Sequence, residues 1–296
     1  MKLIAFTKML PARDVGGLVR LAQRTGLEGF DLCVREGYPV HPGNAEKELP
    51  VVVRQLAEAG LSVPMVTGEG LWHAATEVAS QRILAGMARA GVGLYKLGYF
   101  FYRPDRDGDY WQHVDAARRE LEAWASLAAR EGVKVCYHTH CDVPGLSLGY
   151  HVGTNCAELM HLLRGFDPAQ VGAYIGTGNL VVSGEPFEYG LAMLSDYLAV
   201  VELQDMHLER VQAGDEGAHR RHWTPAGQGA VSWSSVFKSL IRRGFDGPLT
   251  MHAEFEVGQG QSFEELLVRE VIYFKQKREQ ALAAQRCIAD PAPANC

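Results

Sequence analysis

Residues 128–138 read Ala-Ala-Arg-Glu-Gly-Val-Lys-Val-Cys-Tyr-His, and this stretch decides the fold. A helical pattern ends at Gly132, a residue suited to a helix C-cap, and a short apolar run rich in valine follows directly. The same order of helix, glycine and short apolar run returns along the chain at Gly26 with Gly29, Gly60, Gly91 and Gly244. Regular alternation of this kind predicts parallel strands joined by helical crossovers.

The whole chain divides in the same way into short apolar runs separated by helical patterns. Strands are expected at 3–6, 30–35, 61–66, 92–97, 133–138, 171–175, 198–203 and 248–252. Helices are expected from residue 14 onward and at 45–59, 76–90, 109–130, 155–163, 189–195, 232–243 and 263–282. We therefore predict an α/β fold, a single (β/α)8 TIM barrel over residues 1–285, with a disordered tail at 286–296. A doubly wound sheet is the alternative, but residues 7–11, Thr-Lys-Met-Leu-Pro, are not its glycine-rich phosphate loop.

The composition excludes several other classes of protein. The chain has 296 residues, 47% of them hydrophobic and 22% charged, which is too apolar for a disordered protein. No apolar run reaches the roughly 18 residues that span a bilayer, so we expect no membrane association. A net charge of −6 argues against nucleic-acid binding. Six cysteines lie far apart without a CxxC pair, which predicts reduced thiols in a cytoplasmic protein.

The active site of such a barrel lies at the carboxyl ends of its strands, so the polar residues that follow each strand are the candidates. They are Lys8, Arg35, Glu36, Thr67, Glu69, Tyr99, Tyr102, Arg103, His138, His140, Asp142, Thr177, Asn179, Glu202, Asp205, His207, His252, Glu254 and Glu256. This set is rich in histidines and carboxylates, the groups used for general acid–base work and for binding divalent metals.

Two pairs with a spacing of two residues give the strongest signal. In an extended segment His138 and His140 share one face, and so do His252 and Glu254. We interpret Glu254, His138 and His140 as catalytic and His252 as substrate-binding. A hydrogen-bonded structural role for one of the two histidines His138 and His140 is the alternative. A buried carboxylate such as Glu254 also needs a metal or cationic partner.

The remaining candidates follow strands two, four and seven. Glu202 closes an apolar run and is expected to face the barrel interior. We expect Asp205 and His207 to contact substrate, with a loop-capping role as the alternative. Arg35 is a candidate clamp for an anion or hydroxyl, and a salt bridge to its neighbours is the alternative. Tyr99, in an aromatic run, is suited to stacking on a sugar, and a packed loop is the alternative.

Several longer motifs resemble the xylose isomerase-like TIM barrel superfamily, the family of sugar phosphate isomerases and epimerases, over nearly the whole chain. They are Gly-Phe-Asp-Leu-Cys-Val-Arg (29–35), Leu-Pro-x-x-Val-x-x-Leu-x-x-Ala-Gly-Leu-x-Val (49–63), Tyr-His-Thr-His (137–140), Val-Glu-Leu-Gln-Asp (201–205), Gly-Gln-Gly-Ala-Val-Ser-Trp (227–233) and Gly-x-x-Gly-Pro-Leu-Thr-x-His-x-Glu (244–254). The resemblance implies a divalent metal held by Glu, Asp, His and Glu after strands five to eight.

Carried onto this chain, only the last of those metal positions matches, at Glu254. The strand-five position is His138, the strand-six aspartate position is Gly176, and the strand-seven position is Glu202. Asn179 replaces the companion histidine and is expected to contact substrate. The resemblance therefore implies a rearranged site for Mn²⁺, Zn²⁺ or Fe²⁺ built from His138, Glu202 and Glu254, or the loss of the metal.

Together the residues and the resemblance predict an isomerase or epimerase that acts on a small sugar or polyhydroxylated carbonyl compound by proton abstraction next to the carbonyl. A dehydratase (lyase) on the same scaffold and a metal-free, non-catalytic sugar-binding barrel are the alternatives. The partners expected are a small sugar-like substrate and, because barrels of this family commonly pair, a second copy of the chain.

Overall fold

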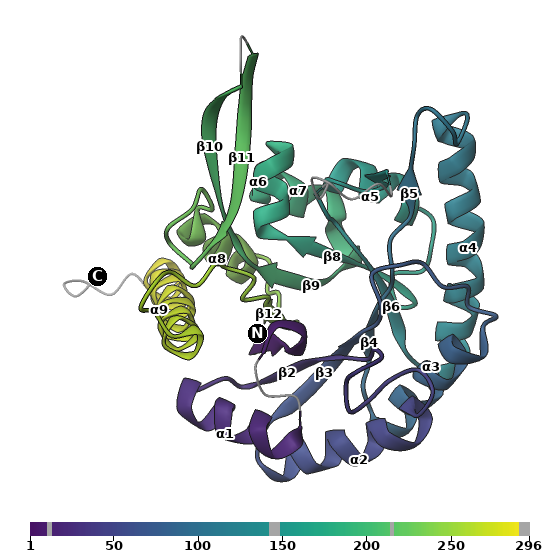
Figure 1. The fold of residues 1–296 in the computed structure, drawn as a ribbon, viewed down its shortest axis with the longest axis horizontal. Coiled ribbons are helices and arrows are strands. Elements are labelled where there is room, and N and C mark those ends of the chain that lie inside the picture. The colour runs from purple at the N-terminus through teal and green to yellow at the C-terminus, as the bar shows by residue number, and fades with distance from the viewer. Residues whose placement is uncertain (11–13, 142–148, 214–215, 290–296) are drawn as a thin grey trace.

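Eight parallel strands close into a barrel in the computed structural model, which describes residues 1–10, 14–141, 149–213 and 216–289. The barrel strands are β1 (Leu3–Phe6), β2 (Gly29–Cys33), β3 (Ser62–Thr67), β4 (Leu94–Lys96), β6 (Lys134–His138), β8 (Val171–Gly176), β9 (Leu198–Leu203) and β12 (Leu249–Met251). Their order around the barrel is β1-β12-β9-β8-β6-β4-β3-β2, and every neighbouring pair is parallel. The predicted TIM barrel is confirmed (Figure 1).

Helices surround this barrel and begin and end close to the predicted positions (Figure 1). They are α1 (Val15–Thr25), α2 (Ala45–Glu58), α3 (Val78–Ala90), α4 (Tyr110–Glu131), α5 (Cys156–Leu163), α6 (Thr177–Ser183), α7 (Phe187–Leu194), α8 (Trp233–Arg242) and α9 (Phe263–Ala289). Asp14 caps α1 by accepting a hydrogen bond from the Gly17 amide at 2.9 Å, while Gly26 ends the helix with φ 77°. Helix α6 was not predicted.

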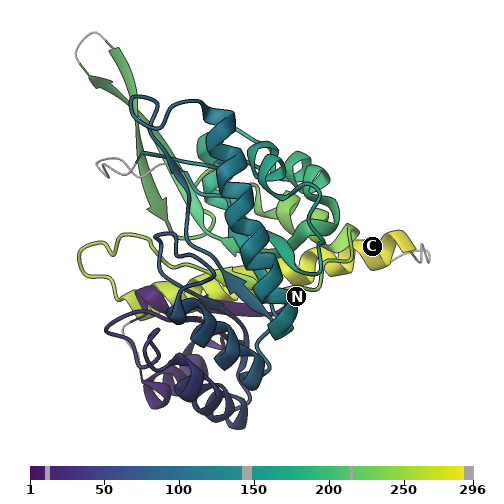
Figure 2. The same cartoon turned by 90° about the vertical axis from the view of Figure 1, so that its right-hand side faces the viewer.

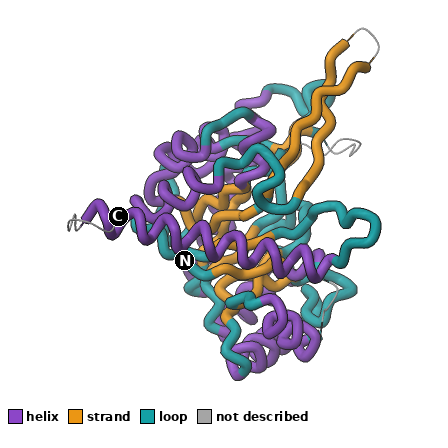
Figure 3. Tube along the Cα trace, turned by 90° about the vertical axis from the view of Figure 1, so that its left-hand side faces the viewer, coloured by secondary structure: helices purple, strands orange, loops and turns teal. Residues whose placement is uncertain are grey.

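Helix α9 extends further than the sequence pattern indicates. It continues through Ala289, so the first residues of the predicted disordered tail are helical, and 290–296 lie outside the described residues. Figure 3 shows α9 lying along one side of the barrel. Four cysteines are free thiols, but Cys287 in α9 is disulfide-bonded, which corrects the expectation that all six are reduced. None of the helices in the described parts of the chain combines the length and apolar character of a bilayer crossing.

The barrel strands bury both faces, as parallel strands covered by helices do. One set of side chains fills the barrel interior, including Ile4, Met65, Cys136, Tyr174 and Val200. The alternate residues pack outward against the helices in the larger apolar core. In β9 this alternation puts the Glu202 side chain on the same face as Val200, inside the barrel, as predicted.

Two small antiparallel ribbons extend the strand ends. Strand β5 (Phe101–Tyr102) pairs with β7 (Tyr150–His151), and β10 (Asp205–Ala213) pairs with β11 (Glu216–Thr224). The second ribbon projects well beyond the rest of the molecule in Figures 1 and 2. Neither ribbon is among the strands expected from the sequence.

Candidate active site

A cavity of about 280 Å³ opens at the carboxyl ends of the barrel strands. Its lining residues come from segments that are far apart in the sequence and that the closed barrel brings together. They are Phe6, Lys8, Arg35, Thr67, Gly70, Leu71, Lys96, Tyr99, Phe101, His140, His151, His252 and Glu254. Seven of the candidates that follow the strands therefore lie around one pocket: Lys8, Arg35, Thr67, Tyr99, His140, His252 and Glu254.

Glu254 lies on the wall of the pocket formed by β1 and β12. Its Oε1 lies 2.9 Å from the Lys8 Nζ and its Oε2 accepts a hydrogen bond from Gln204 Nε2 at 3.1 Å. The side chain retains 19% of its exposure, so the carboxylate reaches the cavity while both oxygens are held in place. Burial favours the neutral acid, but His252 and Lys8 hold the pKa of Glu254 below its usual value, so it is a carboxylate at neutral pH.

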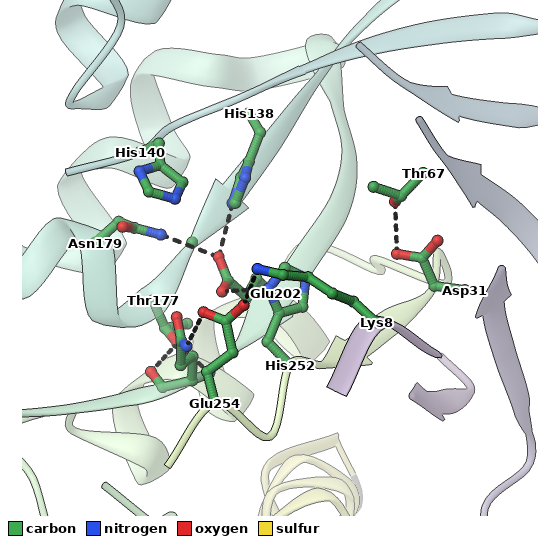
Figure 4. A network of polar contacts seen from close by, with 12 residues as sticks. Lys8, Asp31, Thr67, His138, His140, Thr177, Asn179, Glu202, His252 and Glu254 are labelled. Carbon is green, nitrogen blue, oxygen red and sulfur yellow. Dashed lines mark hydrogen bonds and ion pairs between the residues drawn. The ribbon is translucent and has the colours of Figure 1, made fainter. Parts of the chain in front are cut away.

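The Glu202 carboxylate lies at the centre of a buried polar network below the pocket (Figure 4). Its Oε2 lies 2.7 Å from His138 Nε2 and accepts a hydrogen bond from Asn179 Nδ2 at 3.0 Å. Its Oε1 lies 2.9 Å from His252 Nδ1. Two tyrosines bind the far side of these imidazoles: Tyr99 OH is 2.8 Å from His138 Nδ1, and Tyr174 OH is 2.7 Å from His252 Nε2.

The two histidines in this network hold different protonation states. Burial opposes charge on His252, yet Glu202 raises its pKa, and the imidazolium can donate to both neighbours. Burial lowers the pKa of His138 to about 4, so this imidazole is neutral. Burial also opposes charge on Glu202, but His252 and His138 hold its pKa well below the usual value. Between about pH 4 and pH 6.5 the buried unit is thus one carboxylate, one imidazolium and one neutral imidazole.

These protonation states predict that acid destabilises the protein. As pH falls from 6.5 toward 4, His138 takes up a proton in the unfolded chain but not in the folded one, so the free energy of unfolding falls. A shift from 6.5 to about 4 corresponds to about 3 kcal/mol. Urea denaturation of the wild type and of His138→Gln at pH 7 and pH 4.5 checks this. Equal acid sensitivity of the two proteins would contradict it.

His252 and Glu254 reach the pocket by a different backbone path from the one predicted. Strand β12 ends at Met251, and Ala253 has φ 47°, in the left-handed region that L-residues rarely adopt. An extended segment would have put the two side chains on one face by alternation. Both line the pocket here because the turn at Ala253 redirects the chain, a strain of order 1–3 kcal/mol that surrounding contacts must offset.

The other predicted substrate-binding residues lie away from the cavity lining. Asp205 is fully buried and accepts hydrogen bonds from the amides of Gly227, Gly229 and Val231 and from Trp233 Nε1. It thereby fixes the turn formed by 227–233. Asn179 donates to Glu202 and accepts from the Cys141 amide. His207 is exposed on β10, opposite His222, and Asp142 lies outside the described residues.

The predicted metal ligands His138, Glu202 and Glu254 do not form a metal-binding group. Among the described residues no three His, Cys, Asp or Glu side chains are arranged to hold an ion. Protein groups already surround both carboxylates: two imidazoles and an amide lie within 3.0 Å of Glu202, while Lys8 and Gln204 contact Glu254. His138 Nε2 approaches Glu202 without the geometry of a hydrogen bond, but no third ligand group lies with them among the described residues. A Cβ at Gly176, where the family's aspartate would begin, would collide with Glu202 Oε2 and Asn179 Nδ2.

This misfit predicts that divalent metals leave the folded state unchanged. Mn²⁺ or Zn²⁺ is expected to shift the melting temperature by less than about 1 °C. A bound ion at a hundred times its Kd would stabilise by about 2.7 kcal/mol, or roughly 5–10 °C in a chain of this size. Thermal denaturation with and without each metal, after treatment with a chelator, makes the comparison. A rise of several degrees would show that the carboxylates rearrange around an ion.

Sequence reasoning missed Lys96, Tyr174, His151 and the role of Lys8. Lys96 and Tyr174 lie inside predicted strands, where alternation assigns them to a barrel face but does not reveal a polar contact. A charged residue within the apolar run 92–97 was the one available signal for Lys96.

Arg35 forms no salt bridge to Asp31 or Glu36 in the described structure, and instead its Nε donates to the Gly68 carbonyl at 3.0 Å.

A closed parallel barrel with a polar pocket at the carboxyl ends of its strands defines the TIM-barrel class. The profile of the xylose isomerase-like TIM barrel family matches residues 19–273, and the chain belongs to that family.

Curated relatives are inosose dehydratases. The chain is 25% identical over 193 residues to the protein of Lacticaseibacillus casei, covering 62% of this chain and 60% of that protein. It is 27% identical over 155 residues to that of Geobacillus thermodenitrificans, covering 49% and 48%. The chain thus spans about 60% or less of the length of these relatives.

Solved structures with the same fold include several sugar epimerases. The 3-keto-D-glucoside 4-epimerase YcjR from E. coli superposes with a TM-score of 0.70 at 14% identity, covering 93% of this chain and 99% of that chain. D-psicose 3-epimerase from Clostridium cellulolyticum H10 gives 0.68 at 11% identity, covering 95% and 99%. The probable 3-DHS dehydratase AsbF from Bacillus anthracis gives 0.64 at 13%, covering 93% and 99%. At these identities the likeness concerns the fold.

Proposed function

We propose that this protein is an isomerase or epimerase that moves a proton next to the carbonyl of a small polyhydroxylated compound. The observation that carries the proposal is the presence of two proton-accepting groups, Glu254 and His140, on opposite walls of one cavity. Glu254 follows β12, next to β1, and His140 follows β6, which lies across the barrel from β1.

His140 has a defined tautomer. Its Nδ1 lies 2.6 Å from the Cys141 carbonyl oxygen, which only accepts, so Nδ1 carries the proton and Nε2 has a free lone pair. Burial, then the neighbouring His138 and His151, hold the pKa of His140 well below its usual value. Its ring is therefore a neutral base at physiological pH, as a group that accepts a proton in turnover must be.

The cavity also supplies positive charge for the oxygen of the substrate carbonyl. Glu254 removes the proton from the adjacent, hydroxyl-bearing carbon, the electron pair of the C–H bond forms a C=C bond, and the π pair of the carbonyl moves onto its oxygen. Lys8 and the charge of His252 stabilise the negative charge on that oxygen. For isomerisation, Glu254 returns its proton to the former carbonyl carbon, and the hydroxyl proton of the adjacent carbon passes to the former carbonyl oxygen, so that the carbonyl moves by one position. For inversion, His140 takes a hydroxyl proton of the substrate and delivers it to the opposite face of the same carbon, and Glu254 returns its proton to that oxygen.

A dehydratase is the second candidate, because the curated relatives are named inosose dehydratases. Dehydration begins with the same removal of a proton from the carbon next to the carbonyl, after which a hydroxyl group leaves the next carbon along as water. Lys8, whose ammonium lines the cavity beside Glu254, could supply the proton that the leaving hydroxyl needs.

Incubation in D₂O with a panel of ketoses, keto-sugars, inososes and hexuronates tests these assignments. Deuterium at the carbon next to the carbonyl, with a new isomer or epimer and no loss of water, is the expected result. Loss of water with formation of an unsaturated ketone assigns the dehydratase instead. Ligands that raise the melting temperature but undergo neither change would identify a non-catalytic sugar-binding barrel and overturn the proposal.

A further inference from the structure

One wall of the cavity carries two basic side chains that form no ion pair with a carboxylate among the described residues. Four cationic side chains line the pocket, and two of them have partners: Lys8 pairs with Glu254 and His252 pairs with Glu202. The other two, Arg35 and Lys96, form no ion pair within the described residues. Arg35 follows β2, Lys96 ends β4, and Thr67 ends β3, the strand between them. The excess charge is therefore gathered on one side of the cavity.

Lys96 is the more unusual of the two. It ends β4, it is 4% exposed, and its Nζ lies 3.8 Å from the centroid of the Tyr99 ring, a cation–π contact at the cavity wall. Burial, followed by the neighbouring Arg35, lowers the pKa of Lys96 to about 7. Buried lysines without a counter-ion are rare, because removing an ammonium group from water is costly unless a partner offsets the loss.

Arg35 is held in a fixed orientation beside it. Its Nε donates to the Gly68 carbonyl at 3.0 Å, and its guanidinium carbon lies 5.8 Å from the centroid of the Phe6 ring. The contact through Nε leaves the terminal nitrogens of the guanidinium group for another acceptor. Those nitrogens form a planar pair of donors that matches a carboxylate.

Two buried carboxyl groups act on Lys96 from a distance, Asp31 on β2 and, more weakly, Glu202 on β9. The Oδ2 of Asp31 accepts a hydrogen bond from the Thr67 hydroxyl at 2.9 Å, while Oδ1 has no hydrogen-bond partner among the described residues (Figure 4). Burial raises the pKa of Asp31 to about 6. No ion pair joins either carboxyl group to Lys96 in the described structure, and Glu202 is already paired with His252.

We infer that Arg35 and Lys96 form a subsite for a carboxylate, so that the preferred substrate is a sugar acid or keto acid and not a neutral sugar. This inference rests on the proposed function, because it names the substrate class of the same cavity. Arg35 contacts both carboxylate oxygens through its terminal nitrogens, and Lys96 donates to one of them from the buried side.

A carboxylate fits this wall better than a phosphate group. Phosphate sites in proteins commonly use several backbone amides at a helix N-terminus or in a glycine-rich loop. Here two side chains supply the charge, and the Glu254 carboxylate lines the same cavity of about 280 Å³. A dianion so close to Glu254 meets about twice the repulsion that a singly charged carboxylate meets.

Titration calorimetry with matched probes tests the inference without requiring turnover. Each hexuronate is compared with the corresponding neutral hexose and with the 6-phosphate of that hexose. D-fructuronate, for example, is compared with D-fructose and D-fructose 6-phosphate. D-tagaturonate, D-glucuronate and D-galacturonate are compared in the same way with their hexoses and hexose 6-phosphates. At least one uronate is expected to bind about ten- to hundredfold more tightly than its neutral counterpart. Lys96→Met and Arg35→Gln are expected to bring that ratio close to one, whereas Lys134→Met, at the opposite end of neighbouring β6, should retain it.

Three results would each overturn the inference: neutral sugars or 6-phosphates that bind as tightly as the uronates, no uronate binding at about 10 mM, or an unchanged preference in Lys96→Met. The last would show that Lys96 does not contact the carboxylate of the ligand. Failure of the proposed function has a separate signature, namely a uronate that binds with the expected preference but undergoes neither proton exchange nor loss of water.

Discussion

Glu254→Gln is expected to lower the rate of proton exchange about 10²- to 10⁴-fold, because the substitution removes the group proposed to take the proton from carbon. Glutamine has nearly the same shape and still reaches Lys8 and Gln204, so the pocket retains its form. Two effects combine in the variant. The amide does not accept a proton at neutral pH, and Lys8 loses the carboxylate that lies 2.9 Å from it.

Deuterium incorporation measured by NMR at saturating substrate isolates this effect from binding. Glu256→Gln is the matched control, since Glu256 is exposed, lies two residues further along and does not line the cavity. The control should exchange at the wild-type rate. If Glu254→Gln retained more than about a tenth of wild-type exchange, His140 or Lys96 would be the group that removes the proton from carbon.

Glu202→Gln is expected to destabilise the folded protein by about 3–5 kcal/mol, the usual result of removing one partner from a buried ion pair. The side chain of Glu202 is 1% exposed, so water cannot compensate for its lost charge. His252 would lose the carboxylate that keeps its imidazole charged. It would then either remain a buried unpaired cation or release its proton, and both outcomes cost free energy.

Urea denaturation at pH 6 gives the measurement, with Glu58→Gln as the control. Glu58 lies on α2 with a side chain that is 70% exposed, and its loss should change the free energy of unfolding by no more than about 0.5 kcal/mol. The contribution of the His252 pair is present below pH 6.5 and is lost as pH rises through the raised pKa of folded His252. Glu202→Gln should therefore be most damaging on the acid side, and a uniform effect from pH 6 to 9 would contradict this origin.

The barrel could be predicted because its signal is local. Short apolar runs, helical spacing and glycine caps such as Gly132 each lie within a few residues of one another, and together they fix the order of strands and helices. Glu202 could be assigned to the interior for the same reason, since alternation from Val200 determines its direction. The polar residues after the strands could likewise be placed at one end of the barrel, because the active site of a TIM barrel lies at the carboxyl ends of its strands.

The partners of those residues could not be predicted, because they come from distant parts of the chain. His138, Glu202 and His252 meet only when β6, β9 and the segment after β12 curve around a common axis. Lys96 was assigned to a strand interior, and nothing local indicates that its ammonium reaches the cavity. The spacing of His252 and Glu254 suggested a continued strand, whereas Ala253 turns the backbone with φ 47°.

Gly176 has a consequence for how this site could change during evolution. A lone Gly176→Asp substitution would restore the residue that the family pattern has there, but its Cβ would collide with Glu202 and Asn179. A metal site at this position would need those two side chains to be replaced at the same time and Lys8 to release Glu254. Each change made alone would break a buried contact, so single substitutions that lead toward a metal site are expected to be destabilising.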